Sequence, residues 1–384
     1  MKQNVKYFVY FFIFYYNEYM LENIRRYRQD LHQIPELELD LPKTQNYILN
    51  ILNTYPCQIY SPIPSSVIAY FNNHKKKTIA FRSDMDALPV EEKTSCTFKS
   101  RHNGRMHACG HDGHMAMLLG LADYLKENYK RLNVNVLLIF QPGEESPGGA
   151  KLMCETGFLD IYHVCQIYGT HLWPNLKKGL IATKTGPMMA RSSEVDIDIH
   201  GKKSHAASYQ QGIDALEIAA NYLTEIYSRV KEIPGEVPSL LRFGKMYSGD
   251  IRNVVSDHTR LEGTLRALDD AVYHQLTDIL KSTAKKYPGS FDFHITEGYP
   301  PVKNDAALIE KLLTFLPDLV LLNKHEMISE DFSWYQQYVP GVFFFLGTGT
   351  KIPLHNDHFD FDESILEKGV QNYIQILEHT KSIG

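Results

Sequence analysis

The chain has 384 residues, of which 43% are hydrophobic and 22% are charged, and its formal net charge is -5. A chain of this length can bury a sizeable core and is long enough for two domains. The slightly acidic balance, without a basic block, argues against a nucleic-acid-binding protein. Five cysteines spread over the chain do not make a disulfide framework, so the composition predicts a cytoplasmic protein.

The N-terminal stretch differs from the rest of the chain. Residues 6–16, KYFVYFFIFYY, are almost wholly aromatic and aliphatic. They are too few for a helix that spans a bilayer, which takes about 20 residues, and no small-residue cleavage site follows. We expect residues 1–19 to be a translated leader or a disordered tail, Met20 to be the functional start, and no stable membrane insertion. A membrane anchor is the alternative.

Residues 20–190 alternate between helical and strand-like patterns. Helical spacing over residues 23–32 continues after the proline through residues 34–55, and it recurs from Met117 to Leu125. Apolar runs are typical of strands buried in a parallel sheet, and they occur at residues 78–81, 134–140, 164–169 and 341–347. The alternation predicts an α/β catalytic domain with a mostly parallel sheet, made of residues 20–190 and 299–384.

Residues 191–298 follow a different order. Alternating Val195, Ile197 and Ile199 predict a strand, and a helical pattern follows over residues 212–230. Two strand candidates, a second helix and a last strand come next, at residues 240–247, 259–268, 271–286 and 291–296. This β-α-β-β-α-β order is that of a ferredoxin-like unit, inserted into the first domain because α/β patterning resumes after Pro301.

Polar clusters directly follow the predicted buried strands of the first domain. Asp84 and Asp86 follow the first strand, Glu144 and Glu145 the second, and His171 and His355 the later ones. In open α/β sheets, ligands bind beyond the carboxyl ends of the strands, so these side chains are expected to converge at one rim. The motif MHACGHDGHMAM, residues 106–117, needs that convergence, because Cys109, His111 and a neighbouring histidine give at most three metal ligands.

Thiolate, imidazole and carboxylate groups together predict a transition-metal site. The thiolate favours zinc, whereas imidazole with carboxylate also accepts manganese, cobalt or nickel. Neighbouring glutamates cannot point identically at one metal, so Glu145 is the candidate ligand and Glu144 the candidate general base. A single histidine in a loop or a pair of glutamates is usually a solvated surface feature; it is the co-occurrence of four clusters at strand ends that favours a metal site.

Several motifs together resemble the aminoacylase/carboxypeptidase family of metallohydrolases. They are FRSDMDALPVEE, MHACGHDGHMA, FQPGEESPGGA, GTHLWP, GKKSHAA, SEDFSWY and LHNDHFDFDE, in the order of that family. The resemblance covers essentially all of the chain from Met20 onward. It is to the amidohydrolase branch that holds hippurate hydrolase, N-acetyldiaminopimelate deacetylase and auxin-conjugate hydrolases.

The resemblance implies two divalent metal ions per subunit and hydrolysis of a linear amide bond. The implied metal ligands are Cys109, His111, Glu145, His171 and His355. Glu144 is implied as the catalytic base and Asp86 as a residue that orients the site.

The inserted unit is implied to be the lid and dimerisation domain of a homodimer. His205, Asn253 and Arg266 match family residues that reach the substrate, His205 as an oxyanion donor and Arg266 as a partner for a carboxylate. A surface arginine on a strand is the equal alternative for Arg266.

The chain departs from the family pattern near the expected acyl pocket. Tyr209 and Ser256 stand where proline is usual, and Asp357 follows Asn356 where the family commonly has LHNP.

The predicted function is a dinuclear-metal amidohydrolase acting on N-acyl amino acids, a small-molecule substrate class. The motifs FQPGEESPGGA and IATKTGPMMA are most similar to N-acetyldiaminopimelate deacetylases, and the alternatives are a broader aminoacylase or hippurate hydrolase, a metallo-dipeptidase, and a non-catalytic binding protein on the same fold.

Overall fold

The computed structural model describes residues 20–234 and 238–380, so the expectations for residues 1–19 lie outside the described residues. The chain divides into two compact units. The first contains residues up to Gly186, Lys303–Asn323 and the residues from Trp334 onward, and the second contains Pro187–Val302 and Lys324–Ser333. The segment Lys324–Ser333 therefore packs with the second unit, whereas the sequence analysis placed it in the catalytic domain.

The first unit is built on an eight-stranded sheet with the strand order β1-β2-β4-β3-β5-β14-β6-β13. The central pairs β4–β3, β3–β5 and β5–β14 are parallel, whereas β1–β2, β2–β4 and β14–β6 are antiparallel. The centre of the sheet is thus parallel, as predicted. Its strands are β1 Gln58–Tyr60, β2 Val67–Phe71, β3 Thr78–Asp84, β4 Asn135–Gln141, β5 Val164–Trp173, β6 Ile181–Thr183, β13 Val320–Leu321 and β14 Gly341–Gly347.

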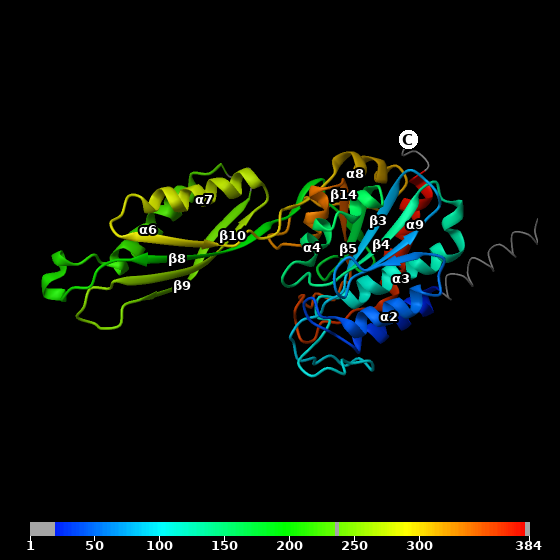
Figure 1. Cartoon of the computed structure of the whole chain (residues 1–384), viewed down its shortest axis with the longest axis horizontal. Coiled ribbons are helices and arrows are strands. Elements are labelled where there is room, and N and C mark those ends of the chain that lie inside the picture. The colour runs from blue at the N-terminus through cyan, green and yellow to red at the C-terminus, as the bar shows by residue number, and fades with distance from the viewer. Residues whose placement is uncertain (1–19, 235–237, 381–384) are drawn as a thin grey trace, which may run out of the picture. The chain divides into compact units, whose positions relative to one another are not determined.

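Helices pack against this sheet and bury its hydrophobic core. The described part of the first helix spans residues 20–32. The longer helices that follow are α2 Pro42–Leu52, α3 His111–Asn128, α8 Ala306–Leu313 and α9 Leu366–His379, and the short ones are α4 Gly149–Glu155 and α5 Phe158–Ile161. Helix α3 runs along strands β3, β4 and β5 and packs against α9 (Figure 1). Almost every residue of α3 up to Leu125 is buried, so its N-terminus is fixed rigidly at the sheet.

Two elements of the first unit differ from the sequence prediction. The helix predicted over residues 34–55 begins only at Pro42, because Leu37 pairs with Ala87 and the Leu41 N–H donates to Ser65 Oγ. Proline suits the first position of a helix, where no N–H is needed. Strand β5 continues to Trp173, because β14 pairs with it in register as far as Gly347. His171 therefore lies inside β5, not in a loop after it.

The second unit has a four-stranded antiparallel sheet with the order β11-β8-β10-β9. Helices α6 and α7 pack together on one face of this sheet (Figure 1). The chain order is β8 Arg191–His200, α6 Ala215–Lys231, β9 Ser239–Ser248, β10 His258–Ala267, α7 Asp270–Ala284 and β11 Ser290–Ile295. These elements come in the predicted β-α-β-β-α-β order. The unit has its own core, which includes Val195, Ile197 and Ile199 of β8.

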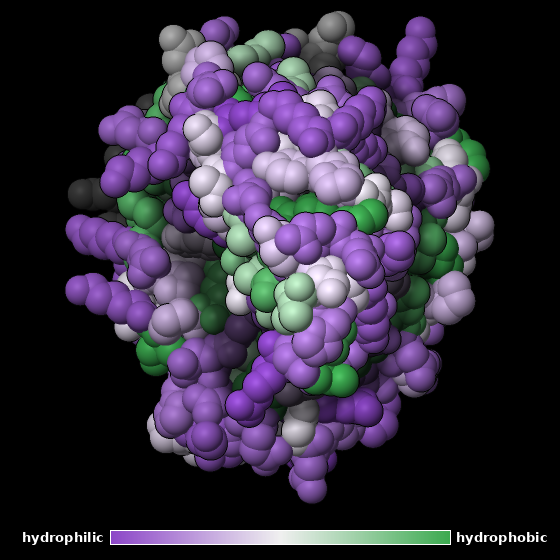
Figure 2. All heavy atoms as spheres, turned by 90° about the vertical axis from the view of Figure 1, so that its left-hand side faces the viewer, coloured by the Kyte–Doolittle hydropathy of each residue, from purple (hydrophilic) through white to green (hydrophobic). Residues whose placement is uncertain are grey.

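The remaining elements are short. They are the strands β7 Gly186–Met189 and β12 Val302–Asn304, which pair with each other, and 3-10 turns at Tyr129–Arg131, Ala206–Gln211, Asp331–Gln337 and Glu363–Ile365. The face of the molecule in Figure 2 is mostly hydrophilic, and its apolar side chains form small groups separated by polar ones. Among the helices that the structure describes, none has an apolar stretch long enough to cross a bilayer.

Candidate metal centre

The N-terminus of α3 places two of the predicted ligands. Gly110 is the N-cap of this helix and has a φ of 87°, a left-handed conformation that favours glycine. A Cβ at this position would lie 2.9 Å from Leu172 Cδ1, so the turn also needs the missing side chain. Cys109 precedes this turn and His111 follows it, and both are buried against the end of the sheet.

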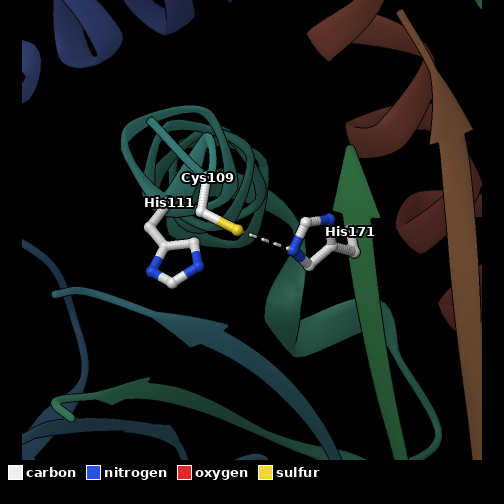
Figure 3. A group of neighbouring side chains, drawn as sticks. All are labelled: Cys109, His111 and His171. Carbon is white, nitrogen blue, oxygen red and sulfur yellow. Dashed lines mark hydrogen bonds between the residues drawn. The ribbon is translucent and has the colours of Figure 1, made fainter. Parts of the chain in front are cut away.

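Cys109 and His171 point toward each other across the gap between this turn and strand β5 (Figure 3). The Cys109 Sγ atom lies 3.4 Å from His171 Nε2. His171 Nδ1 lies 2.7 Å from the Leu172 carbonyl oxygen and must be its donor, because a carbonyl can only accept. The lone pair of His171 is therefore on Nε2, which faces the thiol.

His111 is oriented in a similar way. Its Nδ1–H donates to the backbone carbonyl of Asp86 at 2.8 Å, so in the neutral form of the ring, the form that binds a metal, the lone pair is on Nε2. Within the described residues, His111 Nε2 is buried and has no hydrogen-bond partner. A buried nitrogen without a partner is unfavourable in a protein interior unless a cation or another polar group satisfies it. A metal-binding histidine usually donates its other ring N–H in this way.

Glu145 and His355 complete the group. His355 Nε2 lies 3.1 Å from Glu145 Oε1. The backbone N–H of His355 donates to the Ala108 carbonyl at 2.8 Å, which ties this C-terminal segment to the residue before Cys109. The possible ligand atoms of Cys109, His111 and His171 lie within 4.8 Å of one another, and so do those of Cys109, Glu145 and His355. The five predicted ligands thus come together at one edge of the sheet.

Asp86 fixes the two glutamates through their backbone. Its Oδ1 accepts from the Glu144 N–H at 2.8 Å, and its Oδ2 accepts from the Glu145 N–H at 3.0 Å. Both carboxylate oxygens are used for this purpose, so Asp86 positions the loop that carries Glu144 and Glu145. A ligand atom of Glu144 lies within 4.8 Å of those of His111 and Glu145.

The electrostatics of the group favour a bound cation. Burial, together with Glu145 and Glu144, raises the pKa of the Cys109 thiol well above its usual range. Burial alone would lower the pKa of His111, but Asp84 and Asp86 raise it to about 10. Burial and the neighbouring His114 lower the pKa of His171 well below its usual value. A divalent cation would favour the deprotonated thiol and neutral imidazoles that ligation requires, so these residues fit a metal.

Sequence reasoning did not assign roles to Asp84 and His114. Asp84 Oδ1 lies 2.7 Å from His114 Nδ1, and His114 Nε2 accepts from the Leu172 N–H at 2.9 Å. Both ring nitrogens of His114 are thus engaged, and this residue ties α3 to strands β3 and β5 behind His171. The spacing of His114 three residues after His111 was a usable signal, because such residues share a helix face.

The predicted substrate residues His205, Asn253 and Arg266 belong to the second unit. His205 is exposed, and its Nδ1 accepts from the Ala207 N–H at 3.1 Å. The segment around His205 lies beside that of Asn253, because the Ala206 N–H donates to the Asn253 carbonyl at 3.0 Å. Arg266 lies in β10 and is half-buried, and burial lowers the pKa of its guanidinium. All of these contacts lie within the second unit.

Comparison with known proteins gives the family. The pattern of Peptidase family M20/M25/M40 matches residues 80–379, which is most of the chain. The chain belongs to the M20 family. This confirms the resemblance found in the motifs, since the metallohydrolase family that they indicated is the one that matches.

Individual M20 relatives cover nearly the whole chain. An N-acetyldiaminopimelate deacetylase from Streptococcus uberis is 34% identical over 367 residues, which are 91% of this chain and 97% of that protein. A protein from methicillin resistant Staphylococcus aureus described as an aminohydrolase superposes with a TM-score of 0.90 at 27% identity, over 95% of this chain and 98% of that one. The YXEP protein of Bacillus subtilis, described as a dinuclear metal binding peptidase from the M20 family, gives a TM-score of 0.80 at 28% identity, over 94% and 99%.

Proposed function

We propose that this M20 protein is a dinuclear-metal amidohydrolase that removes the acyl group from N-acyl amino acids. The observation that carries the proposal is the convergence of Cys109, His111, Glu145, His171 and His355 beside Glu144. The relative from Streptococcus uberis supports the substrate class, because it is a deacetylase of an N-acetyl amino acid and matches along 97% of its length.

The proposed ligands of two divalent ions are these five converging residues, with Cys109 central to both groups of ligand atoms. A dinuclear metal-binding relative in the M20 family supports the number of ions. Zinc or manganese is the proposed metal, with cobalt or nickel as alternatives, because thiolate, imidazole and carboxylate ligands suit these ions. When bound, such ions supply Lewis-acid polarisation of the amide carbonyl and lower the pKa of water.

Glu144 is the proposed general base. It is buried, its backbone is held by Asp86, and its carboxylate lies among the proposed ligands. In this role its carboxylate accepts a proton from the attacking water and then delivers that proton to the leaving amine nitrogen. Asp86 acts as a positioning residue, because its two oxygens hold the Glu144 and Glu145 amides in place.

The second unit is proposed to be a ferredoxin-like lid and dimerisation domain of a homodimer. His205 would donate to the oxyanion, and Asn253 and Arg266 would bind the substrate, Arg266 through its carboxylate. These roles rest on the motif matches.

A cytoplasmic location is proposed because all five cysteines are free thiols, which suits a reducing compartment.

The test is a substrate panel assayed with the full-length, metal-loaded protein. N-acetyldiaminopimelate, hippurate and a dipeptide are compared by kcat/KM. We expect N-acetyldiaminopimelate to be preferred over the dipeptide by at least about tenfold, which corresponds to about 1.4 kcal/mol of transition-state stabilisation. A preference for the dipeptide would make the protein a metallo-dipeptidase. Tight binding of the panel without hydrolysis would make it a binding protein.

A further inference from the structure

A second group of metal-ligand side chains lies in the first unit and shares no residue with the candidate centre. It consists of His32, Glu92 and Cys96. His32 is the last residue of the helix over residues 20–32, and the other two lie in the loop after β3. His32 and the Glu92 side chain are buried, whereas Cys96 is half-exposed, so the group opens to solvent on one side.

The distances in this group match the edges of a zinc tetrahedron. His32 Nε2 lies 3.3 Å from Glu92 Oε1, and Cys96 Sγ lies 3.4 Å from the same oxygen. For tetrahedral zinc with ordinary bond lengths, the nitrogen–oxygen edge is about 3.3 Å and the sulfur–oxygen edge about 3.6 Å. All three ligand atoms lie within 4.8 Å of one another. The Thr94 hydroxyl also donates to Glu92 Oε1 and lies 3.3 Å from Cys96 Sγ, so an entering ion would replace these hydrogen bonds.

The surroundings orient His32 and Glu92 as metal sites require. His32 Nδ1 lies 2.8 Å from Asp112 Oδ2 and donates to it, which directs Nε2 toward Glu92 and Cys96. Asp112 is held in turn by Arg28, whose Nε lies 3.1 Å away. The second oxygen of Glu92 accepts from the Ser100 N–H at 2.6 Å, so Oε1 is the oxygen that faces the group.

We propose that His32, Glu92 and Cys96 bind a third divalent ion, of the zinc class, with the fourth position open to water. A neutral imidazole, one carboxylate and one thiolate balance the charge of the ion. This donor set is typical of zinc, and a thiolate disfavours magnesium or calcium.

In the absence of an ion, a proton takes its place. Burial alone would lower the pKa of His32, but Asp112, Cys96 and Glu92 raise it well above the usual value. Burial would raise the pKa of Glu92, but its hydrogen bonds with His32, Thr94 and Ser100 lower it to about 2. The metal-free group thus contains an ion pair between the His32 imidazolium and the Glu92 carboxylate. Ion binding must release protons and weaken as the pH falls.

A bound ion would also stabilise the loop that carries Glu92, and this loop contacts the segment that carries His355 of the candidate centre. Lys93 follows Glu92, and its N–H donates to the Asp357 carbonyl at 2.7 Å. Lys93 Nζ also lies 2.7 Å from Asp357 Oδ2. Asp357 is two residues from His355, so an ion held by Glu92 would stabilise the segment that carries this ligand.

The experiment compares zinc content in wild type, Cys96→Ser and Cys57→Ser. Cys57 is a matched control, because it is also half-buried but its thiol donates to the Leu52 carbonyl and is not among the ligands of this group or of the candidate centre. Each protein is equilibrated with a small excess of zinc and analysed for bound metal per chain. We expect Cys96→Ser to hold one zinc fewer than wild type and Cys57→Ser to hold the same number. Equal zinc in Cys96→Ser and wild type would overturn the proposal.

Cobalt loading tests the same site without relying on stoichiometry. Cys109→Ser removes the thiolate of the candidate centre, so any thiolate-to-cobalt absorption that remains must come from another cysteine. We expect this absorption to persist in Cys109→Ser and to vanish in the Cys96→Ser/Cys109→Ser double variant. Its absence already in Cys109→Ser would contradict a third site. Its persistence in the double variant would assign the signal to a different thiol and also overturn the proposal.

Discussion

Adjacent glutamates differ in what surrounds their carboxylates, although one aspartate holds both of their backbones. The Glu145 carboxylate faces His355 at 3.1 Å, and burial would raise its pKa, but His355 and His111 lower it. Glu145 is therefore held as an anion beside the histidines, as a ligand should be. Ligand atoms of Glu145 lie together with those of Cys109 and His355, whereas the Glu144 carboxylate lies with His111 and Glu145. This difference supports separate roles for two identical side chains.

Replacing Glu144 by glutamine tests the division. Glu144→Gln keeps the shape of the side chain but removes its basicity, and loss of a general base costs about 10²–10⁴-fold in rate. We expect kcat to fall by this amount while bound metal, measured by elemental analysis, stays at the wild-type level. Glu155→Gln, at an exposed glutamate of α4, is the control and should change neither. A parallel loss of metal in Glu144→Gln would instead make this residue a ligand.

The sequence indicated which residues converge, but not how their rings are turned. The metal-loving residue types at strand ends were visible in the motifs, since the carboxyl ends of parallel strands share one edge. The tautomers could not be predicted, because each depends on which backbone carbonyl accepts from the ring Nδ1–H in the folded chain. This carbonyl is that of Leu172 for His171 and that of Asp86 for His111. The same holds for the contact between His355 and Ala108.

At the scale of elements, buried apolar runs predicted where strands lie, but they did not predict where those strands end. The run at residues 134–140 corresponds to β4, because a strand covered on both faces has no polar alternation. The end of β5 was missed because pairing with β14, more than 160 residues away, extends it through His171. Likewise, Leu37 is apolar at helical spacing, but it pairs with Ala87 instead.

The edges of the second unit's sheet predict where a homodimer would form. Strand β11 exposes Asp292 and His294 at one edge, which disfavours pairing with another chain. Strand β9, at the other edge, also exposes Lys245, but beside it Met246 is 45% exposed and Tyr247 59% exposed. We therefore expect the lysine double variant Met246→Lys/Tyr247→Lys to weaken dimerisation by at least about tenfold, or about 1.4 kcal/mol. Sedimentation equilibrium measures this change.

The control for this experiment is Ile161→Lys, which places a lysine at another exposed apolar residue, in α5 of the first unit. It should leave the dimer dissociation constant at the wild-type value. If the double variant dimerises as tightly as wild type, the dimer does not use β9. A monomeric wild type would remove the dimer from the proposal.

At the scale of the whole molecule, the inserted unit was visible because its order of elements breaks the α/β alternation. Segment Lys324–Ser333 was not assigned to that unit, since its contacts are long-range. Met189 pairs with Glu326, and the Ala190 N–H donates to the Glu326 carbonyl at 3.1 Å. Local patterning carries no information about such pairings. The two units have separate hydrophobic cores, so they are expected to unfold with separate stabilities.

This separation gives a prediction for metal removal. All five proposed ligands lie in the first unit, so bound metal should stabilise that unit and not the second. A ligand at 100 times its dissociation constant adds about 2.7 kcal/mol to the free energy of unfolding. In scanning calorimetry we expect chelation to lower one transition temperature by several degrees and to leave the other in place. Chelation should also abolish activity. Adding zinc or manganese back should restore the lowered transition temperature and the activity.

The variant Ile197→Ala assigns the transitions, because Ile197 is fully buried in the second core and its truncation costs about 2–5 kcal/mol. It should lower only the transition that metal does not move. A metal effect on that same transition would place the stabilising ions outside the candidate centre, and full activity in the metal-free protein would end the amidohydrolase proposal.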